Sequence, residues 1–312
     1  MPTVLITGGT GLVGKAITQT LLQNGYEVII LTRDAKKATN IAGITYAEWD
    51  VNKQTIDEIA ISKADYIIHL AGAGVADKRW TSERKQEIVD SRVKSGELLC
   101  KTLQKNNNQL KAFISASAIG WYGPDPVIPN PNPFTEDAPH YNDYLGVTCH
   151  QWEQSLQPLI GLGKRLVILR TGIVLSTDGG ALKEFMKPLN FGIASVMGSG
   201  KQVVSWIHID DLVQLYITAL ENENYSGVYN AVAPAPVNNE HLIIELARQT
   251  KGKFYTKIPV PGFALKLALG EMSIEVLKSA TVSARKVLDH YFIFKFPTIA
   301  AAITNLTKGK TK

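Results

Sequence analysis

Three glycines near the start of the chain have the spacing of a turn that binds phosphate groups. Gly8, Gly11 and Gly14 stand three residues apart, and glycine lets the backbone turn sharply and approach a pyrophosphate closely. A helix that begins at such a turn offers unpaired N–H groups and the positive end of its dipole to anionic oxygens. We therefore predict a dinucleotide-binding turn; the alternative is a tight turn without a ligand.

The residues on both sides of the glycines fit this prediction. Val4 to Ile6 is a short aliphatic run that is typical of a buried strand. A helix is predicted from Leu12 to Asn24, followed by Gly25 as a C-cap residue. Strand, glycine turn and helix form the context that the motif requires. We expect the cofactor to contact the three glycines together with Thr7, Leu12 and Val13.

The end of the second predicted strand, Tyr26 to Leu31, bears on the choice of cofactor. A residue that contacts the ribose is expected about 20 positions beyond the glycines, where Thr32 and Arg33 stand without an acidic residue at the strand tip. An arginine can pair with the 2′-phosphate of NADP(H). We therefore expect NADP(H) rather than NAD(H). The alternative is that Arg33 is a solvated surface residue.

Further strands alternate with helices along the first half of the chain. Strands are predicted at 44–49, 65–70, 111–115 and 165–170, and long helices at 82–104 and 144–159. This order predicts an α/β fold, a Rossmann-type doubly wound parallel sheet whose ligand lies at the carboxyl ends of the strands. At those ends we expect further cofactor contacts from Asp50, Val51, Leu70, Ala71, Gly72, Ser115, Thr171 and Gly172.

The strand–helix rhythm weakens after residue 175. We predict a nucleotide-binding domain over 1–175, to which 203–232 returns, and a smaller, mainly helical substrate-side lobe over 176–312. Helices are expected from Asn238 to about Thr250, from Pro259 to Leu269 and from Ile274 to Leu288, and Asp210 or Asp211 is expected to cap another.

Composition excludes several classes of protein. The net charge is +5 with three lysines in the polar tail, and no basic stripe is interleaved with aromatic residues, so nucleic-acid binding is not expected. No apolar run is long enough to span a membrane, and the first strand begins too early for a signal peptide. Cys100 and Cys149 lack metal-ligand spacing, so no metal is expected. We predict a cytoplasmic protein.

Several motifs resemble the extended short-chain dehydrogenases/reductases. They are the glycine turn, His69-Leu-Ala-Gly72, the Ser-x-Ser…Tyr122-Gly123 turn and Trp206-Ile-His-Ile-Asp-Asp211. Other motifs are similar to one atypical subfamily, the "epimerase family" of nucleoside-diphosphate-sugar epimerases, some of whose members are labelled cell-division inhibitors. These motifs are Ala76-Asp-Lys-Arg-Trp80, Ser117-Ala-Ile-Gly-Trp-Tyr-Gly123, Arg170-Thr-Gly-Ile-Val-Leu175, Gly198-Ser-Gly-Lys-Gln202, Ser205-Trp-Ile-His208 and Ala231-Val-Ala-Pro-Ala-Pro-Val237. The subfamily's C-terminal domain of unknown function resembles 261–305.

The resemblance implies NADP(H) binding and places Ser117 at the catalytic serine. It also implies a Tyr-x-x-x-Lys pair, in which the lysine lowers the pKa of the tyrosine. Tyr144 is followed four residues later by Thr148, and a shift by one residue gives Cys149, so the lysine is missing. Tyr144 could still donate a proton as a neutral phenol; the alternative is a tyrosine that packs on the sheet.

The expected substrate side of the site is rich in polar and aromatic residues. The candidates are Lys78, Arg79, Trp80, Trp121, Tyr122, Gln202, Ser205 and His208. The leading hypothesis is an NADP(H)-dependent oxidoreductase or epimerase that acts on a small oxygenated substrate. The alternative is a non-catalytic NADPH-binding regulator, which the missing lysine favours. The resemblance also implies a homodimer formed through the two long helices at 82–104 and 144–159.

Overall fold

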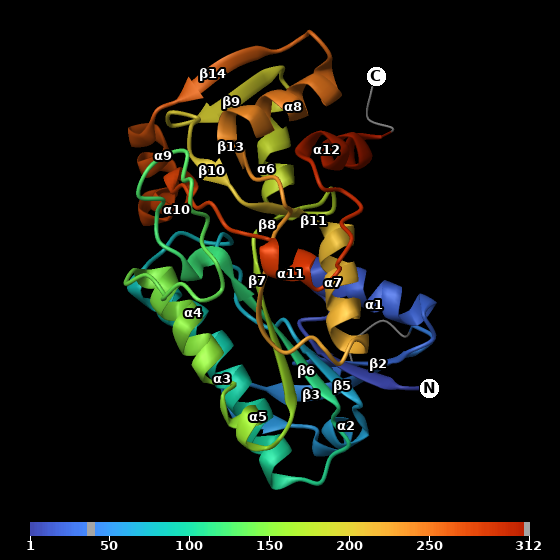
Figure 1. Cartoon of the computed structure of the whole chain (residues 1–312). Coiled ribbons are helices and arrows are strands. Elements are labelled where there is room, and N and C mark those ends of the chain that lie inside the picture. The colour runs from blue at the N-terminus through green and yellow to red at the C-terminus, as the bar shows by residue number, and fades with distance from the viewer. Residues whose placement is uncertain (36–40, 309–312) are drawn as a thin grey trace.

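The computed structural model describes residues 1–35 and 41–308. Its main element is an eight-stranded sheet (Figure 1) in which β3 and β4 are antiparallel and the other neighbouring strands are parallel. The strands lie in the spatial order β12 (Gly227–Ala231), β7 (Arg165–Thr171), β6 (Ala112–Ala118), β5 (Tyr66–His69), β1 (Thr3–Thr7), β2 (Glu27–Thr32), β3 (Ile44–Asp50) and β4 (Thr55–Ile56).

Helices cover both faces of this sheet (Figure 1), so the predicted doubly wound fold is confirmed. One face carries α1 (Leu12–Gln23), α7 (Ile209–Glu221) and α11 (Arg285–Asp289). The other carries α2 (Glu58–Lys63), α3 (Ser82–Lys105), α4 (Tyr144–Gln154) and α5 (Pro158–Gly161).

The apolar run at the start of the chain is continuous because both faces of β1 are buried. Val4 and Ile6 belong to the core under α1 and α7, whereas Leu5 belongs to the core under α3. All three side chains are fully buried. Successive side chains of a strand point to opposite faces, so a central strand covered on both sides needs apolar residues at every position.

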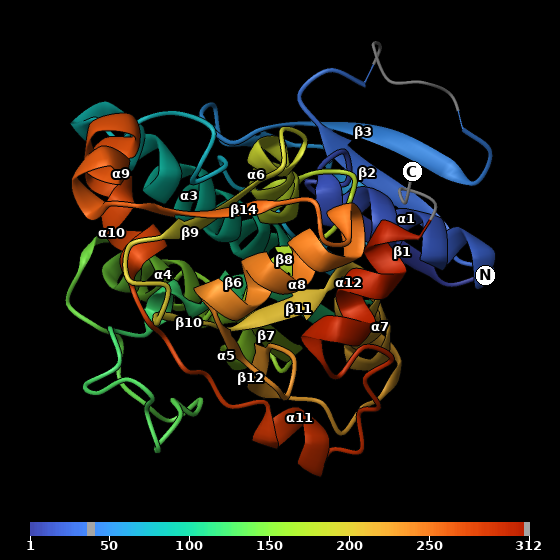
Figure 2. The same ribbon diagram turned by 90° about the horizontal axis from the view of Figure 1, so that it is seen from above.

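A smaller lobe lies beyond one end of the main sheet (Figure 1) and has its own core. It contains three two-stranded sheets as well as helices, and α8 and α12 lie side by side in it (Figure 2). Its elements are β8 (Ile173–Leu175), α6 (Gly180–Leu189), β9 (Ile193–Met197), β10 (Val203–Val204), β11 (Trp206–His208), β13 (Val237–Asn238), α8 (Asn239–Lys251), β14 (Thr256–Val260), α9 (Gly262–Leu269), α10 (Ser273–Leu277) and α12 (Ile299–Thr307). In the described parts of the chain, the 3₁₀ helices are η2 (Ile119–Trp121) and η3 (Gly270–Met272).

The C-terminal segment connects the two parts of the molecule. The Asp125 carboxylate accepts hydrogen bonds from the hydroxyls of Ser279 and Thr281 at 2.7 and 2.8 Å, and Val282 belongs to the core of the main sheet. Further on, the buried Asp211 carboxylate accepts the backbone N–H groups of Lys295 and Phe296. The domain boundary proposed at residue 175 stays a prediction. The C-terminal segment contacts both of the lobes that this boundary would separate.

Four predicted helix boundaries were wrong. The helix predicted from Pro259 begins at Gly262, because Thr256–Val260 forms the strand β14. The helix predicted over 274–288 is divided into α10 and α11, because the intervening residues are extended and bonded to Asp125. The helix predicted over 144–159 ends at Gln154, and α5 begins at Pro158, which has no N–H to continue a helix. His208, not Asp210 or Asp211, is the N-cap residue of α7. No helix within 1–35 and 41–308 is long and apolar enough to cross a membrane.

Candidate functional site

The glycine turn is closely packed and leaves the first helix without a side-chain cap. An added Cβ on Gly14 would lie 2.3 Å from the carbonyl oxygen of Gly8 and 2.7 Å from Cα of Gly9. Gly8 has φ +70°, in the left-handed region that favours glycine. Gly11 is the N-cap of α1 but no side chain caps it, and the first turn holds no acidic residue. The N–H groups and the dipole of α1 are thus available to an anion.

The tip of β5 lies directly beside this turn. The hydroxyl of the buried Thr7 accepts hydrogen bonds from the backbone N–H groups of Leu70 and Ala71, both at 3.1 Å. Gly8 packs against Leu70, since an added Cβ would lie 3.0 Å from its carbonyl carbon. Thr7 therefore joins β1 to the loop that contains Leu70, Ala71 and Gly72. These expected cofactor contacts are brought together, and their binding role stays a prediction.

A hollow of about 750 Å³ adjoins the glycine turn at the tip of β2. Its lining includes Gly9, Thr10, Thr32 and the exposed Arg33, and also Lys15 from the first turn of α1. The sequence analysis did not select Lys15, although its place directly after Gly14 would have been a usable signal. Among the described residues, two cations, Lys15 and Arg33, line this hollow together with the acidic Asp34.

Asp50, one of the expected cofactor contacts, has a local structural role. One of its carboxylate oxygens accepts the backbone N–H groups of Asn52 and Lys53, at 2.9 and 3.1 Å. The N–H of Lys53 is the largest cause that holds the pKa of this carboxyl below its usual value. Val51 follows it and is half-buried. A contact with the cofactor stays a prediction for both residues.

The two serines of β6 have different buried partners. Ser115 lies 3.2 Å from Nδ1 of His69, whose Nε2 lies 2.8 Å from the hydroxyl of Ser95. Burial lowers the pKa of His69 to about 3, so this ring stays neutral. The hydroxyl of Ser117 instead donates to the Glu153 carboxylate at 2.7 Å, and both side chains are buried.

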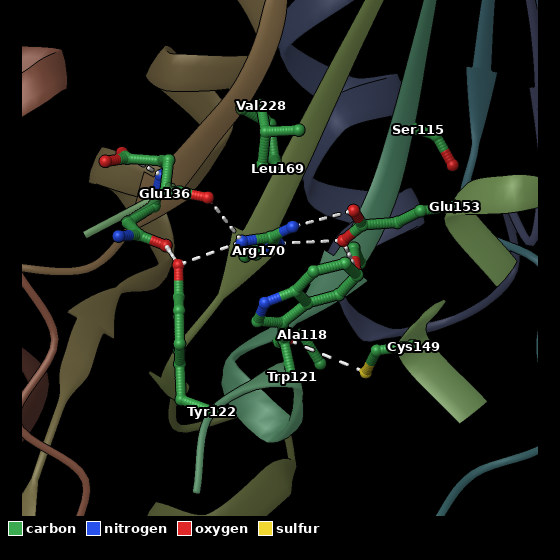
Figure 3. Close-up of polar contacts among 12 residues, drawn as sticks. Ser115, Ala118, Trp121, Tyr122, Glu136, Cys149, Glu153, Leu169, Arg170 and Val228 are labelled. Carbon is green, nitrogen blue, oxygen red and sulfur yellow. Dashed lines mark hydrogen bonds and ion pairs between the residues drawn. The ribbon is translucent and has the colours of Figure 1, made fainter. Parts of the chain in front are cut away.

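Glu153 belongs to a buried polar network around Arg170 (Figure 3). Nε and Nη2 of Arg170 each lie 2.9 Å from a different Glu153 oxygen, which gives a bidentate ion pair. Nη1 of Arg170 donates to the hydroxyl of Tyr122, and the guanidinium lies 3.5 Å from the ring centroid of Trp121. This network holds Ser117, Trp121 and Tyr122 in place.

The hydroxyl of Tyr144 and the hydroxyl of Ser117 form hydrogen bonds with different partners. Its hydroxyl donates to the carbonyl oxygen of Lys85 at 3.0 Å, and its ring meets Trp80 edge-on at a centroid distance of 4.9 Å. Burial is the largest cause that raises the pKa of Tyr144. The two expected catalytic residues are not hydrogen-bonded to each other, and their catalytic roles stay predictions.

The expected substrate residues fall into two groups. Near the β5–α3 loop, Lys78 is exposed, the Trp80 ring donates to Val75, and Arg79 donates to the carbonyl oxygen of Leu267 on α9 at 2.9 Å.

The second group is buried and hydrogen-bonded inside the protein. Gln202 donates to Met197, Ser205 donates to Ala280, and Nδ1 of His208 accepts the N–H of Asp210. Near the tip of β7, Thr171 donates to Leu169 and an added Cβ on Gly172 would lie 2.6 Å from the Ser205 carbonyl oxygen. Binding roles stay predictions for both groups and for Thr171 and Gly172.

Comparison with known protein sequences gives matches over almost the whole chain. Residues 4–231 match the NAD dependent epimerase/dehydratase family, and residues 260–306 match a domain of unknown function, DUF1731. An epimerase family protein of Staphylococcus saprophyticus is 36% identical over 302 residues, which cover 97% of this chain and 98% of that protein. One from Staphylococcus aureus is 36% identical over 308 residues, which cover 99% and 100%.

Solved structures give matching results. The human epimerase family protein SDR39U1, crystallised with NADPH, has a TM-score of 0.85 and 27% identity, with 98% of this chain and 99% of that chain covered. A nucleoside-diphosphate sugar epimerase from Corynebacterium glutamicum has a TM-score of 0.77 and 32% identity, with 98% of this chain and 58% of that chain covered.

Proposed function

Because the chain belongs to the NAD-dependent epimerase/dehydratase family, we propose that it binds NADP(H) and acts as an oxidoreductase or epimerase on a small oxygenated substrate. The family expected from the sequence motifs is confirmed. The observation that carries the cofactor proposal is the glycine turn, where Gly14 leaves no room for a side chain and α1 begins without a cap.

The residues of the turn fit a dinucleotide. Gly8, Gly11 and Gly14 would hold the pyrophosphate at the N-terminus of α1. Arg33 would pair with the 2′-phosphate of NADP(H), and Lys15 in the same hollow would add a second positive charge. Bound NADP(H) supplies or accepts a hydride. The NADPH in the human relative's structure supports this choice of cofactor.

A second candidate function is that of an NADPH-binding regulator without turnover. It is favoured by the partners of the two expected catalytic residues. The Ser117 hydroxyl donates to Glu153, and the Tyr144 hydroxyl donates to the carbonyl oxygen of Lys85. A substrate oxygen could bond to either hydroxyl only if that internal bond were exchanged.

Titration of the purified protein with NADPH and with NADH, followed by nucleotide fluorescence, tests the cofactor proposal. We expect NADPH to bind at least about tenfold more tightly, a difference of about 1.4 kcal/mol. Arg33→Ala should remove most of this preference and Lys15→Ala part of it. Arg285→Ala is the matched control, because Arg285 is an exposed arginine on α11 that forms an exposed pair with Asp289.

The results separate the two functions. If neither nucleotide binds, both fail. If NADPH binds, aldehydes and ketones are screened as substrates by following NADPH oxidation. Turnover of one of these compounds would support the proposal that the protein is an enzyme. Binding without turnover by any carbonyl compound or sugar nucleotide would favour the regulator.

A further inference from the structure

A cation on α3 is fixed against the loop that follows β5. Arg92 is half-buried, and its Nη1 donates to the carbonyl oxygens of Ala73 and Ile88 at 3.0 and 2.9 Å. The guanidinium also lies against Gly72, where an added Cβ would be 3.0 Å from its Cζ. The position of the positive charge is therefore set by the same loop that packs against the glycine turn.

This guanidinium has no carboxylate partner in the described parts of the chain. Arg84, two turns earlier on α3, pairs with Asp77 and Glu87, whereas Arg92 takes part in none of the ion pairs. Removing a cation from water without a counter-charge costs free energy. An anionic group of a ligand would offset this cost.

Two of the nitrogens of Arg92 are still able to donate. Both protein hydrogen bonds come from Nη1, and within 1–35 and 41–308 Nε and Nη2 have no partner. Neither atom is among the fully buried unpaired nitrogens, so both keep some access to solvent. A planar guanidinium whose Nε–Nη2 edge is free is suited to bind a phosphate or carboxylate.

The neighbours of Arg92 place it on the β5–β6 side of the sheet. The guanidinium lies 5.1 Å from the ring centroid of Trp152 on α4, and its charge acts on the Cys149 thiol and the Tyr144 phenol. Residues 144–154 contain neither lysine nor arginine; the cations beside them come from other elements, Arg170 from β7 at Glu153 and Arg92 from α3 at Trp152. A dinucleotide that crosses the glycine turn extends from β2 toward this side.

We propose that Arg92 binds an oxyanion of the ligand held at the carboxyl ends of β5 and β6, which is either the pyrophosphate of the cofactor or an anionic group of the substrate. This inference rests on the proposed function, because it needs a ligand at the same edge of the sheet. It goes further by assigning an anion-binding role to a residue outside the glycine turn and outside α4.

Two variants separate the charge of Arg92 from its role as a tether of the loop. Arg92→Gln keeps a shorter N–H donor but removes the charge, whereas Arg92→Lys keeps the charge. Lys94→Gln is the control on the same helix, because Lys94 is exposed and paired with Asp90. Each variant is titrated with NADPH, with adenosine 2′,5′-bisphosphate, which lacks the nicotinamide half, and with inorganic phosphate in the presence of saturating NADPH. Thermal melting checks that each variant is folded.

If the oxyanion belongs to the cofactor, Arg92→Gln weakens NADPH binding about tenfold, which is about 1.4 kcal/mol. Bisphosphate binding stays unchanged if Arg92 binds the nicotinamide-side phosphate of the pyrophosphate, which the bisphosphate lacks, and weakens as well if it binds the adenosine-side phosphate. If it belongs to the substrate, NADPH binding is kept, and phosphate binding to the NADPH complex weakens by a similar factor. In either case Arg92→Lys retains more affinity than Arg92→Gln.

Two results would overturn the inference alone: Arg92→Gln matching the wild type with both NADPH and phosphate, or Arg92→Lys losing as much affinity as Arg92→Gln. A wild-type protein that binds no NADPH would overturn the proposed function and this inference with it.

Discussion

The hydroxyl of Ser117 donates a hydrogen bond to the Glu153 carboxylate at 2.7 Å, and both side chains are buried. Ser117 lies opposite Arg170 in the parallel β6–β7 pair, and the same carboxylate forms the bidentate ion pair with Arg170. The serine expected to orient a substrate is thus part of a network that joins β6, β7 and α4.

This network predicts a large loss of stability when Glu153 is neutralised. Glu153→Gln leaves the guanidinium of Arg170 buried without a counter-charge, which costs about 3–5 kcal/mol. Ser117→Ala removes one hydrogen bond and should cost about 1–2 kcal/mol. Urea denaturation followed by circular dichroism measures both changes. Glu184→Gln is the control, because Glu184 and Lys187 form an exposed pair and its loss should cost less than about 1 kcal/mol. Equal stability of Glu153→Gln and this control would contradict the prediction.

Local patterns were sufficient to predict most of the main sheet. The strand, glycine turn and helix at the start of the chain follow from residues close together in the sequence, and the aliphatic run of β1 already indicates burial on both faces. The C-terminal segment could not be predicted in this way. Its extended part is held by Asp125, more than 150 residues away in the sequence, so its local helical pattern did not decide its structure.

In the candidate site, too, local sequence predicts some residues, whereas others depend on long-range packing. The sequence could predict Gly8, Gly11, Gly14 and Arg33 as cofactor contacts because motif spacing is a local property, and their binding roles stay predictions. It did not locate Arg92, whose place beside Gly72 and Trp152 depends on how α3 packs against α4. Nor could it show that the Tyr144 hydroxyl bonds to Lys85, since the rotation of a helix is set by packing.

The close packing of the glycine turn predicts that Gly14→Ala abolishes nucleotide binding. Its methyl group would lie 2.3 Å from the carbonyl oxygen of Gly8, and this backbone can yield only if the turn opens. We expect NADPH affinity to fall more than about a hundredfold, which is more than about 2.7 kcal/mol. Gly161→Ala on α5 is the matched control, because no atom lies within 4 Å of the added Cβ. Tight NADPH binding by Gly14→Ala would show that the turn is not the binding site.

The two cysteines should be unreactive in the folded protein. Cys100 and Cys149 are both buried, and burial raises the pKa of each thiol to about 12. Because the thiolate is the nucleophile, labelling with iodoacetamide at pH 8 should modify neither residue in the native state and both in 6 M guanidinium chloride. Intact mass spectrometry counts the added groups. Rapid modification of Cys149 in the native protein would show that the β6–α4 region opens readily.

The neutral His69 predicts a loss of stability at acid pH. Its pKa is lowered to about 3 by burial, whereas an unfolded histidine has a pKa of about 6.5. Between these values the unfolded state binds one more proton at this residue than the folded state. Stability therefore falls as the pH falls, by about 1.4 kcal/mol for each pH unit below about 6.5.

The His69→Gln variant cannot take up this proton. Between pH 7 and pH 5 the wild type should lose about 2 kcal/mol more stability than the variant, as measured by urea denaturation at each pH. His241→Gln, at an exposed position on α8, should follow the wild type. A wild type and a His69→Gln variant with the same dependence on pH would show that His69 is protonated within the fold, which its bonds to Ser95 and Ser115 would then have to accommodate.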